Sequence, residues 1–104
     1  MSPENALKLL SNPTRVAVLK WLKNPDEAFA GYSQLYPFAQ YGVCATLIQD
    51  KAGLSQPATS LCLKALHNAG LVEASKVGKW TYYRRAESRI REITNVVTQS
   101  LQAL

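Results

Sequence analysis

One stretch of the chain places small polar side chains along a predicted helix, on the side that its apolar residues leave free. In residues 55–72, SQPATSLCLKALHNAGLV, a predicted buried stripe recurs at helical spacing on Thr59, Cys62, Leu63 and Leu66. The outer side then consists of Gln56, Pro57, Ser60, Leu61 and Lys64. The major groove of DNA admits one helix, and short polar side chains near its N-terminal end can reach base edges. This helix is therefore a candidate DNA contact; the alternative interpretation is an ordinary capped core helix.

A second chemical signal is a local excess of positive charge. Between Ala74 and Arg91 a single acid, Glu87, accompanies six bases: Lys76, Lys79, Arg84, Arg85, Arg89 and Arg91. The whole chain has 12 basic and 7 acidic residues and a net charge of +5. So dense a local excess indicates a polyanionic partner, and nucleic acid fits best. The alternative is a solvated basic surface without a specific partner.

The elements around the candidate helix follow a helix-turn-helix pattern. Ser55 is well placed to cap the helix, and Gly70 to end it. Residues 43–53, VCATLIQDKAG, predict a shorter preceding helix with Gly53 as its stop signal. Two short helices joined by a tight turn that contains glycine are typical of the helix-turn-helix.

Residues 71–85 change to a strand pattern and predict a β-hairpin. Leu71 and Val72 begin the first strand, and residues 76–79 form the turn, in which Gly78 supplies a positive φ. Residues 80–83, WTYY, are strong strand formers. The hairpin tip is basic because it carries Lys76 and Lys79.

Three further helices are predicted, over residues 3–10, from the cap Asn12 to Asn24, and over residues 87–103. Residues 25–41 hold two prolines and several aromatic residues, so we expect a partly ordered loop with a short helical turn, its aromatics packed onto the core. The last helix has an apolar stripe of Ile90, Ile93, Val97 and Leu101. A core of this size has limited room for that stripe, which we therefore expect to face a partner subunit.

The totals limit the class of protein. A chain of 104 residues with 47% apolar composition predicts one domain, residues 1–104, with a compact core. Its apolar runs fall short of the roughly 18 residues of a membrane span, and its start does not resemble a signal peptide. We therefore expect a cytoplasmic protein with no membrane partner and with Cys44 and Cys62 as free thiols. No catalytic triad or carboxylate pair stands out, which argues against an enzyme.

Helix, helix-turn-helix, basic hairpin and helix is the layout of a winged-helix domain, mainly α with a β-hairpin wing. Three runs, LSNPTRVAVLKWL, AGLSQPATSLCLKALHNAGLV and VGKWTYYRR, in this order and spacing, resemble the ArsR/SmtB family of dimeric winged-helix repressors. The resemblance implies a repressor that binds a double-stranded DNA operator and is released by a signal. It also implies a homodimer built from the first and last helices, through Leu7, Leu10, Ile90, Ile93, Val97 and Leu101. We expect no cofactor.

Carried over to this sequence, the family's base-facing positions fall on Gln56, Pro57, Ser60 and Leu61, with Ala45 close by on the preceding helix. The predicted DNA-binding set is completed by Ser55, Lys64, Lys76, Lys79 and Arg84. Many family members have histidine where this chain has Leu61. Leucine can offer only an apolar contact, for example to a thymine methyl group.

The releasing signal is less defined by the sequence. Metal-sensing relatives carry a CVC motif where this chain has Cys44, Ala45 and Thr46, and one thiolate is too few for a soft metal ion. The last helix has no His or Asp, and His67 is expected on the surface. We therefore expect no metal site and slightly prefer a thiol-based redox switch at Cys44 and Cys62. The alternative is that both cysteines fill the core.

A different class of function fits the same layout. A winged helix can serve as a protein-interaction module that never contacts DNA. The basic hairpin and the polar outer helix face argue against this interpretation, and salt dependence of binding would discriminate between the two.

Overall fold

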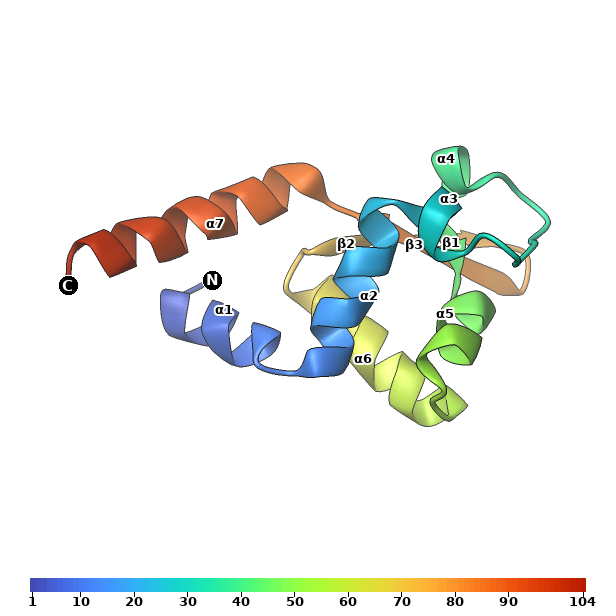
Figure 1. The fold of residues 1–104 in the computed structure, drawn as a ribbon, viewed down its shortest axis with the longest axis horizontal. Coiled ribbons are helices and arrows are strands. Elements are labelled where there is room, and N and C mark those ends of the chain that lie inside the picture. Colours follow the sequence, from blue (N-terminus) through green and yellow to red (C-terminus); the bar gives the residue numbers. More distant parts are fainter.

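The computed structural model describes residues 1–104, and its secondary structure is mostly helical (Figure 1). The helices are α1 (Pro3–Leu10), α2 (Pro13–Lys23), α3 (Pro25–Ala28), α4 (Phe38–Tyr41), α5 (Ala45–Ala52), α6 (Gln56–Asn68) and α7 (Glu87–Gln102). The strands are β1 (Val43–Cys44), β2 (Val72–Val77) and β3 (Trp80–Arg85). In Figure 1, α1 and α7 extend together to one side, and the sheet and the α5–α6 pair lie toward the other. None of the helices is long and apolar enough to cross a membrane.

Capping residues set the starts of α2 and α6 and the end of α5, as the sequence predicts. The Asn12 side-chain oxygen accepts hydrogen bonds from the backbone N–H groups of Thr14 and Arg15, at 2.9 and 3.2 Å. At the start of α6, Ser55 Oγ accepts from the N–H of Ala58 at 3.2 Å. Helix α5 ends at Gly53, whose φ of 67° is left-handed. Helices α5 and α6, joined by the short turn at Gly53, confirm the predicted helix-turn-helix.

The sheet has three antiparallel strands in the order β1-β3-β2. The predicted hairpin is confirmed, although its turn is tighter than expected: Lys76 and Val77 belong to β2 and pair with Thr81 and Trp80. Only Gly78 and Lys79 remain in the turn, and Gly78 has a φ of 61°.

The prediction that the first helix of the helix-turn-helix begins at Val43 is wrong. Val43 and Cys44 form β1 and pair with Tyr83 and Tyr82 of β3, so that α5 begins only at Ala45. Both residues are almost fully buried, at 0% and 4% exposure. A two-residue strand has no period of its own, and its partner lies far away in the sequence.

Residues 25–41 are more regular than predicted, and their aromatic side chains do pack inward. Phe29 is buried and lies edge-on to Trp21 and Tyr32, with ring centroids 6.2 and 5.6 Å apart. Tyr36 and Tyr41 pack against the buried Tyr82 of the sheet. This segment therefore forms one side of the core, with α3 and α4 as its helical turns.

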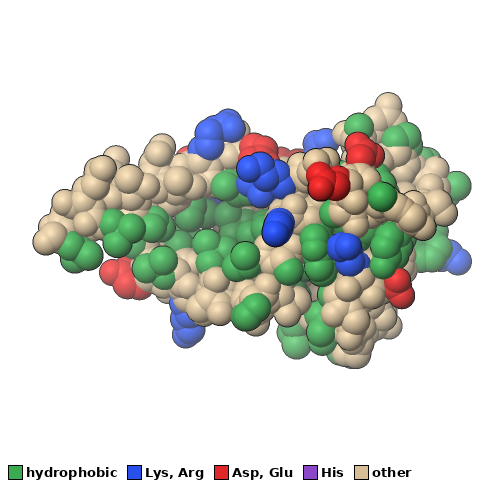
Figure 2. Space-filling view, in the orientation of Figure 1, with side chains coloured by type: hydrophobic (Ala, Val, Ile, Leu, Met, Phe, Trp, Pro, Cys, Tyr) green, Lys and Arg blue, Asp and Glu red, His purple; other side chains and the backbone are tan.

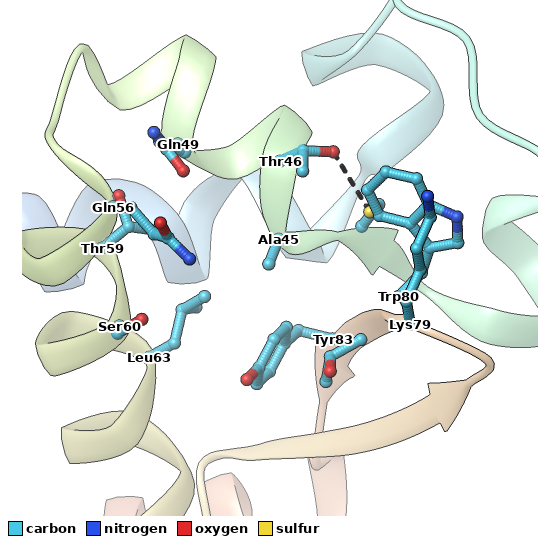
Figure 3. Close-up of a pocket in the computed structure, with 12 residues that line it drawn as sticks. Ala45, Thr46, Gln49, Gln56, Thr59, Ser60, Leu63, Lys79, Trp80 and Tyr83 are labelled. Atoms are coloured by element: carbon cyan, nitrogen blue, oxygen red, sulfur yellow. Dashed lines mark hydrogen bonds between the residues drawn. The ribbon is translucent and has the colours of Figure 1, made fainter.

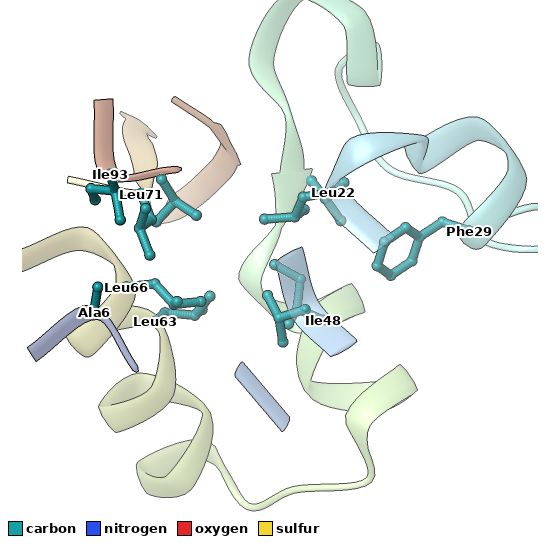
Figure 4. Packing of buried hydrophobic residues seen from close by; sticks show 11 residues of the cluster. Ala6, Leu22, Phe29, Ile48, Leu63, Leu66, Leu71 and Ile93 are labelled. Carbon is teal, nitrogen blue, oxygen red and sulfur yellow. The ribbon is translucent and has the colours of Figure 1, made fainter. Parts of the chain in front are cut away.

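The main core lies between α6 and the elements around it (Figure 4). Leu63 and Leu66 of α6 are 2% and 0% exposed and belong to one cluster with Ile48 of α5 and Leu71 before β2. Thr59 is also buried, and its hydroxyl donates to the Ser55 carbonyl oxygen at 2.9 Å. Cys62 is only partly buried. The predicted stripe of α6 thus faces the core and leaves the polar side outside.

We expect Gly42→Ala to destabilise the protein more than Gly53→Ala. Both glycines have positive φ, 88° and 67°, so alanine is strained at either position. At Gly42 the added Cβ would also meet the Tyr83 carbonyl oxygen, whereas at Gly53 it would meet open space. Urea unfolding at fixed protein concentration should show a loss of about 1 kcal/mol for Gly53→Ala and about 3 kcal/mol for Gly42→Ala. Equal losses would show that the β1–β3 approach tolerates a side chain.

Candidate nucleic-acid interface

The N-terminal ends of α5 and α6 and the tip of the β2–β3 hairpin border a hollow of about 290 Å³ (Figure 3). Twelve residues line it: Cys44, Ala45, Thr46, Gln49, Gln56, Thr59, Ser60, Leu63, Lys79, Trp80, Thr81 and Tyr83. One side of the hollow is formed by α5 and α6 and is mostly polar. The other side is formed by β3 and by Lys79 in the turn before it. The hollow brings together residues from separate parts of the sequence: β1, the helices α5 and α6, and the hairpin.

The helix α6 presents its predicted outer face to solvent. Gln56 and Ser60 are exposed and line the hollow, whereas Pro57, Leu61 and Lys64 are exposed beside it. Leu61 is 70% exposed, which leaves a large apolar side chain free for contact on an otherwise polar face. Ser55 caps the start of α6, just after the end of α5, and Ala45 lies at the start of α5 and lines the hollow. These positions are accessible at the surface, and their contacts with bases and phosphates stay a prediction.

The hairpin tip adds an aromatic residue that is absent from the predicted DNA-binding set. Lys79 is exposed in the turn, and its Nζ lies 5.2 Å from the centroid of the Trp80 ring. Trp80 is 37% exposed and lines the hollow. Its signal in the sequence is a large aromatic side chain directly after the turn. The exposed Lys76 lies nearby on β2, opposite Thr81.

The basic run of residues 74–91 does not form one free positive surface. Arg84 Nε lies 3.0 Å from the Glu73 carboxylate in an exposed pair across β2 and β3, and Arg84 does not line the hollow. Arg85 pairs with Glu87 at 2.8 Å, and Arg89 with Glu92 at 3.0 Å. Lys76 and Lys79 of the hairpin and Arg91 of α7 have no acidic partner, so two of the three free cations of this run lie near the hairpin tip.

The two cysteines have different surroundings. Cys44 is buried and lines the hollow, and its Sγ lies 3.1 Å from Thr46 Oγ1 (Figure 3). Cys62 is partly buried on α6. Burial raises the pKa of the Cys62 thiol, and the nearby Arg15 opposes that rise. Neither thiol belongs to a group of three or more His, Cys, Asp or Glu residues, and no such group exists in the structure. His67 is exposed, as predicted.

A separate apolar groove of about 230 Å³ runs between α1 and α7. Figure 2 shows hydrophobic side chains gathered along it. Its lining includes five of the six residues predicted for a subunit interface: Leu7, Leu10, Ile90, Ile93 and Val97. Leu7 and Leu101 are 55% and 60% exposed, whereas Ile93 is already buried within the chain. Exposed leucines in a continuous apolar surface indicate a binding surface for another protein chain.

The chain is similar in sequence to known proteins, although no family model matches it. The chain is 39% identical over 95 residues to the "Uncharacterized HTH-type transcriptional regulator YbzH" of Bacillus subtilis, covering 91% of this chain and 94% of that protein. It is 32% identical over 98 residues to the "Putative arsenical resistance operon repressor ArsR2" of Halobacterium salinarum, covering 94% of this chain and 66% of that protein.

A solved structure supports the same fold. The homodimeric winged helix-turn-helix DNA-binding domain of a "possible ArsR-family transcriptional regulator" from Mycobacterium bovis matches with a TM-score of 0.59 and 26% identity. The match covers 97% of this chain and 80% of that chain. Its description agrees with the α5–α6 pair and the β2–β3 wing seen here.

The raised pKa of Cys62 predicts slow alkylation at neutral pH. A higher pKa leaves a smaller fraction of reactive thiolate, so the alkylation rate should reach its midpoint at higher pH in the folded protein than in urea. Iodoacetamide labelling of the Cys44→Ser variant, followed by mass spectrometry, measures this midpoint. Arg15→Gln removes the opposing positive charge and should move the midpoint further up. A lower midpoint in the folded protein than in urea would contradict a raised pKa of Cys62.

Proposed function

Since the chain belongs to the ArsR/SmtB family of winged helix-turn-helix transcriptional regulators, we propose that it is a homodimeric repressor that binds an operator and is released by a signal. One observation carries the DNA-binding part of the proposal. The polar end of α6 and the unpaired lysine at the wing tip border the same hollow. A helix in the major groove and a cation on the adjacent backbone need this relative placement.

In the proposed complex, α6 enters the major groove and its side chains have different roles. Gln56 and Ser60 offer hydrogen bonds to base edges, and the exposed Leu61 contacts a thymine methyl group. Pro57 packs close to the bases, and Ala45 approaches from the start of α5. The N-terminal end of α6, next to Ser55, favours a phosphate.

The lysines supply the sequence-independent part of the affinity. Lys64 on α6 and Lys76 and Lys79 on the wing are exposed and free of ion pairs, so they contact phosphates without first giving up a partner. Arg84 contributes only if its exposed pair with Glu73 opens, which costs little at a surface.

The homodimer is proposed through the apolar groove between α1 and α7. The groove and the exposed Leu101 give this surface an apolar area that a second copy would cover. The structural neighbour from Mycobacterium bovis is described as homodimeric. A twofold dimer presents two α6 helices, and half-sites one turn of B-DNA apart need their centres about 34 Å apart.

For the signal, we propose a thiol modification rather than a metal ion. Cys44 lies in the wall of the hollow that DNA would cover, so an oxidised or sulfur-bound thiol there adds bulk at the DNA-facing surface. Cys62 sits on α6 itself, where a modification would disturb the packing of that helix.

Lys79→Ala tests the wing contact. This variant removes one phosphate-binding cation per subunit. We therefore expect the slope of log K against log salt to become shallower by about 0.9 for each subunit. The duplex is first selected from random DNA, and binding is followed by fluorescence anisotropy over a range of salt concentrations. Lys8→Ala, an exposed lysine of α1 away from the hollow, is the matched control and should leave the slope unchanged. Salt-independent binding, or no duplex binding at all, would favour the protein-interaction module instead.

The thiol proposal is tested with Cys44→Ser, Cys62→Ser and the double variant. Peroxide or polysulfide should release the parent protein from its duplex, and dithiothreitol should restore binding. The double variant should stay bound, and the single variants show which thiol responds. Release of the double variant to the same extent as the parent would eliminate the thiol switch while leaving DNA binding intact.

A further inference from the structure

A basic depression lies where α2, α3 and α5 meet, on residues that do not line the hollow described above. Its volume is about 640 Å³, and its lining consists of Lys20, Trp21, Lys23, Asn24, Glu27, Ala28 and Lys51. None of these residues borders the hollow at the wing or the groove between α1 and α7. We propose that this depression binds a small organic anion, a carboxylate or phosphate ester attached to a planar ring.

The charge of the lining favours an anion. Three lysines, Lys20 and Lys23 from α2 and Lys51 from α5, meet one carboxylate, that of Glu27. The carboxylate accepts a hydrogen bond from Asn24 Nδ2 at 2.9 Å, and the lysines form no ion pair. The lining therefore carries a net positive charge that only solvent and mobile ions balance.

The helix dipole explains why each lysine stands at a helix end, but it does not explain why the three lysines line the same depression. Lys20, Lys23 and Lys51 all lie in the last turn of a helix, where a cation is favourable against the helix dipole. Lys8 occupies the same kind of position in α1 and lines none of the principal pockets. The dipole thus explains one lysine at each helix end, but it gives no reason for two helices to direct theirs to one depression.

The aromatic side chain that lines the depression, Trp21, indicates that the ligand has a planar ring beside its anionic group. Lys51 Nζ lies 5.2 Å from the centroid of the Trp21 ring and 5.7 Å from that of Phe29, so the ammonium group is held over aromatic faces. Trp21 and Ala28 supply the apolar part of the lining. An anionic ring can lie along this wall while its charged group reaches the lysines, and the volume is within the range of small-molecule sites.

The test uses the full-length protein labelled with ¹⁵N and phenyl phosphate as the probe, without DNA, so its result does not depend on the proposed DNA-binding function. We expect saturable shifts of the backbone amides of residues 20–24, 26–28 and 51, with a dissociation constant of about 1 mM for a ligand of this size. Inorganic phosphate and benzyl alcohol each supply half of the ligand and should bind more weakly.

Matched variants decide whether the lysines bind the probe. Lys51→Gln should weaken phenyl phosphate binding about tenfold, because it removes a charge-assisted contact. Lys8→Gln removes the same charge from an equivalent helix end and should leave binding unchanged. Thermal unfolding of each variant checks that the fold is retained.

Three results would overturn the proposal. The first is the absence of saturable shifts, or shifts centred on the groove between α1 and α7. The second is an equal effect of Lys8→Gln and Lys51→Gln, which would indicate general charge attraction. The third is displacement of phenyl phosphate by a short DNA duplex that shifts the same amides, which would make the depression part of the DNA-binding surface.

Discussion

The pairing of β1 with β3 is the constraint that positions the candidate DNA surface. Val43 and Cys44 pair with Tyr83 and Tyr82, and Cys44 leads directly into α5. The start of the helix-turn-helix is thereby fixed to the strand that carries the wing. The approach is close enough that Gly42 must lack a side chain. Because α5 packs against α6, the same pairing also sets where the polar end of α6 lies relative to Lys79 and Trp80.

The distribution of charge follows from which side chains find partners within the chain. Three of the four arginines after the wing tip form ion pairs: Arg84 with Glu73, Arg85 with Glu87, and Arg89 with Glu92. Arg85 also donates to the Leu19 carbonyl oxygen, and Arg91 has no acidic partner. The lysines have no such partners. Lysine carries a compact, strongly hydrated charge on a flexible stem, so it remains exposed and available to a phosphate or a carboxylate. The unpaired positive charges of the chain are therefore mainly lysines, and they lie at separate places, including the wing tip and the depression beside Trp21.

Helix α2 contributes residues to the basic depression and to the groove between α1 and α7, and its buried side packs in the same core as α6. Its C-terminal half carries Lys20, Trp21 and Lys23 of the basic depression, and Leu19 lines the groove between α1 and α7. Its buried residues Val18 and Leu22 belong to the same core cluster as Leu63 and Leu66 of α6. A close-packed core transmits displacements between such neighbours. The surfaces proposed for a ligand, a second subunit and an operator thus all belong to elements that pack on one helix.

The helix-turn-helix, the hairpin and the polar outer face of α6 could be predicted from the amino-acid sequence because their signals are local. Caps such as Asn12 and Ser55, the left-handed Gly53 and the stripe of Leu63 and Leu66 act between residues a few positions apart. Three other features became visible only in the folded chain: the β1 strand, the placement of Trp80 and Ser60 around one hollow, and the ion pair of Arg84 with Glu73. Each of these contacts joins two segments that are far apart in the sequence. The residue pattern within one segment does not indicate which distant segment it will contact in the folded chain.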